Sequence, residues 1–289
     1  MDNIVNVTGG KGGTSFLILG DKKAALIDCG MAYCASNLIS NIKRVLNTRA
    51  LDYVLVSHSH YDHIGAVPYL REQWPDIKIC GSEHDKYILN RYNALKTIKE
   101  LSVQAAEIYG RGLFKEYNDE MMKIDTVISD GDIVDLGGLS IQVLETPGHT
   151  RCTLSFLVNN EVLFASESTG VMSQSGKVYP AFLISYSKSI DSINKCREIN
   201  PKFIISPHFG LVNKIDALQY WEKCILAARE SRDFILHLFN LGYGEERILL
   251  EYENAFQDEE FRMEQPLNAF RLNTRYMIKA VLNENCRQR

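Results

Sequence analysis

The feature that most constrains how this chain folds is a cluster of three histidines and one aspartate in residues 58–63, directly after an apolar stretch at 51–56. His58 and His60 are two positions apart, so on an extended backbone their side chains leave on the same side. Asp62 and His63 follow a turn later and can face a second point. Packing does not explain so many metal-binding donors in one place. The pattern predicts a buried strand with metal ligands at its C-terminal end, a common α/β arrangement.

Further nitrogen and oxygen donors occur in other segments, each at the end of a predicted strand or just after one. These segments are Ile27-Asp28-Cys29-Gly30, Pro147-Gly148-His149-Thr150, Ser166-Glu167-Ser168 and Pro207-His208-Phe209-Gly210. Only a folded core can bring such separated donors together. Two ions about 3.5–4 Å apart could share one activated water and polarise a substrate oxygen. We therefore expect two divalent transition metals, with zinc favoured and iron or manganese as alternatives.

The remaining pattern predicts alternating strands and helices. Strands are expected at 4–7, 14–19, 23–28, 51–56, 77–80 and 203–206, hairpins at 133–136 with 139–144 and at 154–158 with 162–165, and helices at 34–47, 64–73 and 187–198. Residues 83–123 are polar and helix-compatible, and 168–186 are expected to form a loop. The glycine-rich run at 9–13 precedes a strand and lacks the ending of a phosphate-binding loop, which favours a flexible hairpin.

The strand signal stops near Asn213. Apolar residues then recur at three- and four-residue steps, which indicates an amphipathic helix; they are Leu218, Trp221, Ile225, Ala228, Ile235 and Leu238. Two further helices are predicted at 245–256 and 267–283. We expect a main domain at 1–212, with a helical insertion at about 83–123, and a helical extension at 213–289 packed on it. The alternatives for this extension are to roof the active site or to supply the face of a homodimer.

Composition narrows the class of partner. The formal net charge of −4 gives no electrostatic case for binding nucleic acid or an anionic membrane. The sequence shows neither a signal peptide nor an apolar stretch long enough to span a bilayer. The 7 cysteines are scattered, with no Cys-x-x-Cys pair. We interpret them as reduced thiols of a cytoplasmic protein. The expected partner is a small molecule.

The ordered motifs resemble those of the metallo-β-lactamase superfamily. The His-x-His-x-Asp-His signature is matched by His58-Ser59-His60-Tyr61-Asp62-His63, followed in order by the His149 motif, an acidic residue after a hairpin strand and a late His-x-Gly. The resemblance covers residues 1 to about 212. It implies an α/β fold, namely an αββα four-layer sandwich of two mixed β-sheets, with the helical C-terminal extension added to it.

The resemblance also implies roles for individual residues. His58, His60 and His149 would hold the first metal, and Asp62, His63 and His208 the second, with Glu167 as the bridge. Asp28 and Thr150 would orient the metal ligands without binding the metal themselves. Relatives usually carry Asp where this chain has Glu167, which is one methylene longer and could either bridge both ions or leave one weakly held. His208-Phe209-Gly210 also departs from the more frequent Gly-His-Gly.

The expected chemistry is attack by a metal-bound hydroxide, with Asp62 orienting the water and accepting its proton. Aromatic residues in 83–123, in 168–186 and in the C-terminal helices predict a covered cleft for a small acyl substrate. Candidate substrate-binding residues are Tyr179, Tyr186 and Phe209. The helical insertion and extension are similar to the thioesterase branch, which includes aminobenzoylacetyl-CoA and acyl-carrier thioesterases.

Other readings of the same motifs stay open. Lactone opening uses the same carbonyl chemistry, phosphodiester hydrolysis is a further alternative, and a metal-binding regulatory protein would keep the ligands with little turnover. Two other histidines and one cysteine are not expected to be ligands. His84 is expected at the surface after a capping Ser82, His237 buried or half-buried in a helix, and Cys152 facing the core.

Overall fold

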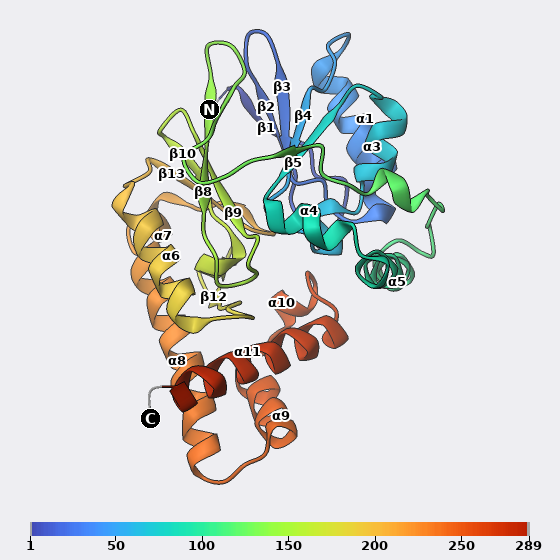
Figure 1. Ribbon diagram of the computed structural model, residues 1–289. Coiled ribbons are helices and arrows are strands. Elements are labelled where there is room, and N and C mark those ends of the chain that lie inside the picture. The colour runs from blue at the N-terminus through green and yellow to red at the C-terminus, as the bar shows by residue number, and fades with distance from the viewer. Residues whose placement is uncertain (1, 288–289) are drawn as a thin grey trace. The chain divides into compact units, whose positions relative to one another are not determined.

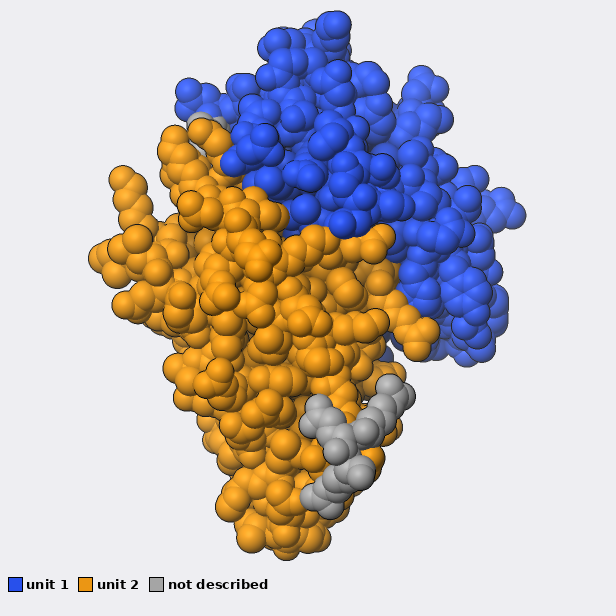
Figure 2. Space-filling view, turned by 60° about the vertical axis from the view of Figure 1, so that its left-hand side comes forward, with its two compact units in different colours: residues 1–144, 154–160 blue, residues 145–153, 161–289 orange. Residues whose placement is uncertain are grey.

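The computed structural model describes residues 2–287, and of Arg287 only the backbone. The chain forms two compact units, shown in different colours in Figure 2. Unit 1 comprises Met1–Leu144 and Leu154–Asn160, and unit 2 comprises Glu145–Thr153 and Glu161–Arg289. This division differs from the expected boundary at 212, because residues before that point share a core with the C-terminal helices. Phe182 and Leu183, for example, belong to the same buried cluster as Ile248 and Met277.

Unit 1 contains a six-stranded sheet in which spatial order follows chain order. Its strands are β1 (Ile4–Asn6), β2 (Phe16–Leu19), β3 (Ala24–Ile27), β4 (Tyr53–Leu55), β5 (Lys78–Gly81) and β6 (Thr126–Val127) (Figure 1). Strands β1, β2 and β3 pair antiparallel, whereas β3, β4, β5 and β6 pair parallel, so the sheet is mixed. The two-residue β6 was not predicted, because its strand character comes only from its pairing with β5.

The helices of unit 1 are η1 (Ala32–Cys34), α1 (Ala35–Leu46), α2 (Tyr61–Ile64), α3 (Val67–Gln73), α4 (Glu83–Leu89), α5 (Tyr92–Tyr109) and η2 (Asp119–Met121). Among them, α1 follows the predicted apolar periodicity most clearly. Leu38, Ile42 and Leu46 recur every four residues on α1 and are buried, and truncating Ile42 to alanine would cost about 2–5 kcal/mol of stability. Helices α4 and α5 confirm the helical character of residues 83–109, whereas residues 110–118 form no helix, and Ser82 caps α4 as expected.

Three further strands complete unit 1, and two of them confirm the predicted hairpin of 133–136 with 139–144. They are β7 (Ile133–Asp135), β8 (Ser140–Glu145, whose last residue is assigned to unit 2) and β9 (Leu154–Val158). β7 and β8 pair antiparallel across Gly137 and Gly138, both with positive φ. Asn159 and Asn160, which follow β9, also have positive φ, as expected for a tight turn.

Unit 2 begins with short strands and ends in helices. Its elements are β10 (Val162–Phe164), η3 (Glu167–Thr169), β11 (Val171–Met172), β12 (Val178–Tyr179), α6 (Tyr186–Glu198), β13 (Phe203–Ser206), β14 (Gly210–Leu211), α7 (Lys214–Ala217), α8 (Tyr220–Asn240), α9 (Glu245–Phe256), α10 (Glu259–Arg262) and α11 (Leu267–Arg287). β10 pairs parallel with β13, and β13 pairs antiparallel with β14. The expected loop at 168–186 contains the β11–β12 hairpin, a pairing too short to be visible in the sequence pattern.

The C-terminal helices pack on one another through a core of unit 2, which includes Ile235, Tyr252, Phe270 and Ile278. Two expectations about these helices were wrong. Leu218 is not part of the apolar stripe: it lies between α7 and α8 and is 84% exposed. His237 is exposed and not buried, because it lies on the outer face of α8 beside the buried Leu238. Among residues 2–287, no helix is long and apolar enough to cross a membrane.

Candidate functional site

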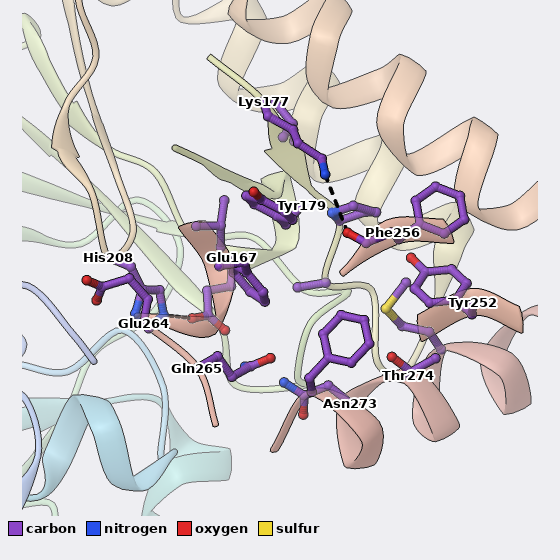
Figure 3. Close-up of a pocket in the computed structure, with 17 residues that line it drawn as sticks. Glu167, Lys177, Tyr179, His208, Tyr252, Phe256, Glu264, Gln265, Asn273 and Thr274 are labelled. Carbon is purple, nitrogen blue, oxygen red and sulfur yellow. Dashed lines mark hydrogen bonds and ion pairs between the residues drawn. The ribbon is translucent and has the colours of Figure 1, made fainter. Parts of the chain in front are cut away.

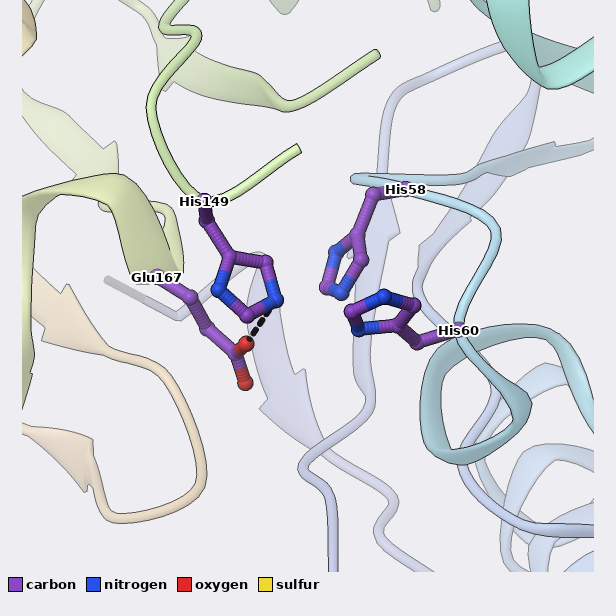
Figure 4. A group of neighbouring side chains, drawn as sticks. All are labelled: His58, His60, His149 and Glu167. Carbon is purple, nitrogen blue, oxygen red and sulfur yellow. Dashed lines mark ion pairs between the residues drawn. The ribbon is translucent and has the colours of Figure 1, made fainter. Parts of the chain in front are cut away.

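The donors of unit 1 lie in the loop after β4 and in the short helix α2. His58 and His63 are buried, whereas His60 and Asp62 are half-buried. The ring centroid of His58 is 4.4 Å from that of His60 and 4.1 Å from that of His63. The ligand atoms of His58 and His60 lie within 4.8 Å of each other, as do those of Asp62 and His63. Three imidazoles and a carboxylate therefore gather at the predicted strand end, with the His58 and His60 rings drawn in Figure 4.

Asp28 fixes this loop from the end of the neighbouring strand β3. Its carboxylate accepts hydrogen bonds from the backbone N–H and the hydroxyl of Ser57, both at 2.7 Å. The same carboxylate lies 2.8 Å from Nδ1 of His63. A proton on Nδ1 leaves Nε2 of His63 as the atom with a lone pair for a metal. Asp28 adopts a left-handed conformation with φ of 52°, which Asp tolerates better than most residues.

The glycine-rich loop at 9–13 lies against the same donors. Gly13 has φ of 154°, and a Cβ on Gly13 would lie 2.6 Å from the backbone carbonyl oxygen of Asp62. No L side chain fits there without displacing the α2 backbone. The loop therefore serves as close backbone packing behind Asp62.

The donors of unit 2 converge on Glu167, which begins η3 shortly after the end of β10. Its Oε2 lies 2.6 Å from Nε2 of His149, a contact drawn as a dashed line in Figure 4. Its Oε1 lies 2.5 Å from Nε2 of His208, which Figure 3 shows. His149 comes from the 145–153 loop and His208 from the turn between β13 and β14. One carboxylate thus reaches two imidazoles, one with each oxygen.

His149 is held by its own loop and by two neighbouring segments. Its backbone N–H donates to the Ser168 hydroxyl at 2.8 Å, and its Nδ1 lies 2.7 Å from the carbonyl oxygen of Ala181. A carbonyl can only accept, so Nδ1 carries the proton and Nε2 is the lone-pair atom. Thr150 closes the loop through a 2.7 Å bond between its hydroxyl and that of Thr153. Its predicted supporting role is compatible with this position.

His208 has a backbone conformation that is rare for its residue type. Its φ is 63°, in the left-handed region that costs a non-glycine residue about 1–3 kcal/mol. The strain arises because Ser206 of β13 pairs with Gly210 of β14, which leaves a tight turn between them. The turn directs the His208 imidazole toward Glu167. Such strain is typical of positions kept for function.

The predicted substrate-binding residues lie in different places. Tyr179 lines a cavity of unit 2 together with Glu167 and His208. Tyr186 and Phe209 are not among its lining residues. Tyr186 begins α6, where Arg232 lies 4.6 Å from its ring centroid, and the backbone of Phe209 accepts a hydrogen bond from Gln174.

Sequence reasoning missed the cavity residues on the C-terminal helices. Phe270, Thr274 and Met277 follow helical spacing on α11, and all three are buried lining residues. This periodicity was the available signal, but it does not distinguish a cavity wall from an ordinary core face. Two of the residues that were not expected to be metal ligands are Cys152 and His84. Cys152 is buried as expected, and His84 is half-buried with its ring stacked on Tyr87.

Comparison with known proteins places the chain in a family. The model of the metallo-β-lactamase superfamily matches residues 8–208. The metallo-β-lactamase fold-containing protein ST1585 of Sulfurisphaera tokodaii is 29% identical over 206 residues, covering 69% of this chain and 74% of that protein. A hydroxyacylglutathione hydrolase of Xylella fastidiosa is 30% identical over 152 residues, or 53% of this chain. That match spans only 43% of the Xylella protein's length.

Solved structures agree on the fold. The crystal structure of ST1585 from Sulfolobus tokodaii has a TM-score of 0.59 and 27% identity, covering 76% of this chain and 85% of that one. The metallo-β-lactamase family protein TTHA1429 of Thermus thermophilus has a TM-score of 0.67 over 99% of this chain and 95% of its own, at 16% identity. The predicted fold class, α/β with mixed sheets and C-terminal helices, is confirmed. The chain belongs to the metallo-β-lactamase superfamily.

Proposed function

We propose that this protein is a metal-dependent hydrolase of thioesters with small acyl groups, and that its seven donors hold two transition-metal ions, most favourably zinc. In this proposal His58, His60 and His149 bind one ion, Asp62, His63 and His208 bind the other, and Glu167 bridges them. All seven donors fall within the 8–208 stretch that the superfamily model matches. Imidazole nitrogen and carboxylate oxygen are donors that zinc takes in proteins, with iron and manganese as alternatives.

The observation that carries the proposal is the position of Glu167. One of its oxygens faces His149 and the other faces His208, and these two histidines are assigned to different ions. A carboxylate with one oxygen toward each ligand set is suited to bridge two cations. The longer Glu side chain, which departs from the usual Asp, reaches both imidazoles from the start of η3. This geometry favours bridging over the alternative of one weakly held ion.

Neighbouring residues fix which imidazole nitrogen of His63 and His149 is available to bind a metal. The Asp28 carboxylate and the Ala181 carbonyl bind Nδ1 of His63 and of His149, so both rings present Nε2. When bound, the ions supply Lewis-acid polarisation of an oxygen and make water acidic enough to act as a nucleophile near neutral pH. Asp62 would orient the attacking water and take its proton on a carboxylate oxygen. Water is added across the C–S bond, giving a carboxylic acid and a free thiol.

The thioester assignment is supported by a relative. The Xylella protein is named for hydrolysis of an acylated glutathione, and an acyl group on a thiol is a thioester. Because that match covers under half of the relative's length, the reaction is part of the proposal. We also infer a cytoplasmic location, since no disulfide joins the cysteines in the part of the chain that the structure describes, as is usual in a reducing compartment. A small acyl substrate and a homodimer remain predictions.

Metal analysis and a substrate panel test the proposal together. The purified protein should contain up to two transition-metal ions per chain and should cleave a model acyl thioester, with activity lost on chelation and regained on adding zinc. A protein that holds metal but leaves thioesters, esters, lactones and phosphodiesters intact would instead be regulatory. Faster cleavage of bis(p-nitrophenyl) phosphate or of a lactone than of any thioester would assign the site to those substrates. A chain that retains no metal after gentle purification would refute the mechanism.

A further inference from the structure

Unit 2 contains a cavity of about 50 Å³ whose lining includes Glu167 and His208 as well as side chains of α9, α10 and α11 (Figure 3). Every residue that lines it belongs to unit 2. The C-terminal helices therefore supply the wall of a space that opens on two of the proposed metal ligands. A group that fills this space would lie next to the reacting atoms of a bound substrate.

The walls of the cavity are mainly apolar. Phe256, Phe261 and Phe270 line it from three successive helices. Two of the polar side chains in the lining already have partners: the Tyr252 hydroxyl pairs with Ser231 at 2.7 Å, and the Lys177 ammonium lies 2.5 Å from the Asp258 carboxylate. Such a lining favours a hydrocarbon group over a charged one.

The size of the cavity limits what it can hold. A protein cavity of about 150 Å³ accommodates benzene, and a water needs roughly 10–15 Å³. At about 50 Å³, the space has room for about two to four non-hydrogen atoms. A short aliphatic chain fits this limit, whereas an aromatic ring or a long fatty chain does not.

Hydrogen bonds and ring stacking hold the cavity wall on the β11–β12 side. The wall therefore limits the size of the group that the cavity can hold. Asp258, which caps α10, accepts bonds from Lys177 and from the Tyr179 hydroxyl, the latter at 2.7 Å. The Tyr179 ring stacks on Phe261 with centroids 4.2 Å apart. Ser175 adds a 2.6 Å bond to Glu260. These contacts join the hairpin to α10 and hold the aromatic wall at its present position.

Two polar side chains of α11 give the cavity a second recognition element. Asn273 and Thr274 both line it from α11, and Thr274 is 1% exposed. Both side chains can donate and accept hydrogen bonds. An oxygen on the chain of a bound ligand would find these donors in a mainly apolar wall, to which Glu264 and Gln265 also contribute.

We propose that this cavity is the acyl subsite, that it restricts the acyl chain to about two to four non-hydrogen atoms beyond the carbonyl carbon, and that Asn273 and Thr274 favour chains bearing a hydroxyl or keto oxygen. The inference rests on the proposed thioester hydrolysis and names its substrate class. Phe256 and Phe261 set the length limit, because they face the space from α9 and α10.

The test compares chain lengths on the metal-loaded enzyme. Thioesters of N-acetylcysteamine from acetyl to octanoyl would be hydrolysed by the wild type, by Phe256→Ala and Phe261→Ala, and by the control Phe239→Ala, which alters an exposed phenylalanine of α8 outside the cavity. In the wild type, kcat/KM should peak at three to five acyl carbons and fall about 10-fold or more by octanoyl. Each cavity variant should move the peak to longer chains, and the control should not.

Binding without turnover separates this inference from the proposed reaction. The matching S-alkyl thioethers would be titrated calorimetrically into metal-loaded and chelator-treated protein, with circular dichroism to confirm that each variant is folded. A length limit in binding that Phe261→Ala relaxes, with no thioester cleaved, would keep the subsite and reject the reaction. Hydrolysis with a flat length profile, or with a peak unmoved in both folded cavity variants, would overturn the subsite while the reaction stands.

The preference for a chain that bears an oxygen can be measured separately from the chain length. The ratio of kcat/KM for 3-hydroxybutanoyl over butanoyl thioester should fall about 3- to 10-fold in Asn273→Ala or Thr274→Val. Thr274→Ser keeps the hydroxyl and should keep the ratio. An equal ratio in the wild type and both variants would remove Asn273 and Thr274 from substrate recognition.

Discussion

In unit 1 the four donors come from residues 58–63, whereas in unit 2 the three donors, His149, Glu167 and His208, come from separate segments of the chain. The first group is fixed by local geometry: one strand end, one turn and a supporting carboxylate. The second depends on a loop, a 3-10 turn and a strained turn each being held by distant residues. A local motif can therefore predict a metal site from the sequence alone, whereas a complete site requires that separate segments of the chain fold together.

The strongest way to break this comparison is to remove one donor from each group. His60→Ala and His208→Ala should each lower thioesterase kcat/KM by about 10³-fold, because a cation contributes several kcal/mol to transition-state stabilisation and each 1.36 kcal/mol is a factor of ten. The double variant should be little worse than either single one, as expected for donors that act as a unit. Metal content would be measured alongside.

His237→Ala is the matched control, since His237 is exposed on α8. It should leave both metal content and rate unchanged. Full activity in His208→Ala would show that the dispersed group is dispensable, and the two groups would then not share one centre.

The proposed bridging role of Glu167 can be tested separately from the histidines. Glu167→Gln removes the negative charge that faces both imidazoles, so bound metal should fall from two ions toward one and the rate by about 10²-fold. Glu167→Asp keeps the charge and should be intermediate. Metal stoichiometry by mass spectrometry decides the matter: two tightly held ions in Glu167→Gln would rule out a bridge.

Removing a residue that only hydrogen-bonds to a proposed ligand should lower metal affinity less than removing the ligand itself. Asp28→Asn weakens the bond to Nδ1 of His63 and those to Ser57, so metal affinity should drop about 10- to 100-fold. Competition with a chromophoric chelator would measure it. Asp76→Asn, at an exposed position, is the control, and an unchanged affinity in Asp28→Asn would make Asp28 a purely structural residue.

Gly13 tests how tightly the local group is built. Gly13→Ala places a methyl group 2.6 Å from the Asp62 carbonyl and should cost about 1–3 kcal/mol of unfolding free energy. Gly112 also has positive φ, but a Cβ there meets nothing within 4 Å, so Gly112→Ala should cost only about 1–2 kcal/mol, from backbone strain alone. Urea denaturation compares the two, and equal losses would mean that the Asp62 backbone moves aside freely.

The smallest expected effect belongs to Asp258 in unit 2. Burial alone would raise the pKa of Asp258, but hydrogen bonds from Lys177 and Tyr179 outweigh it and hold the pKa below its usual value. A lowered pKa stabilises the fold above the unfolded value of about 3.9 and is lost as the pH falls through the folded value. Asp258→Asn should therefore cost about 0.2–1 kcal/mol near neutral pH and progressively less below about pH 4. Unfolding free energies measured across this range would show a pH-independent difference if the contacts contribute nothing.

Much of this protein followed from local patterns. The strand before His58, the helix with Leu38 and Ile42, and the hairpin turn at Gly137 and Gly138 lie where periodicity and turn chemistry predict them. These features depend on residues a few positions apart, which is the range over which a sequence pattern is informative. The β11–β12 hairpin, the exposure of Leu218 and the outward position of His237 depend on neighbours from elsewhere in the chain, and local patterns missed them.

The same division applies to the candidate site. The donor types, their order and the pairing of His58 with His60 follow from the amino-acid sequence alone, because a two-residue period on an extended chain leaves little choice. The contacts of Glu167, with one oxygen toward His149 and the other toward His208, and the cavity that α9, α10 and α11 close beside Glu167 and His208 arise only in the folded chain. Both outcomes depend on long-range packing between segments distant in sequence, which no local pattern specifies.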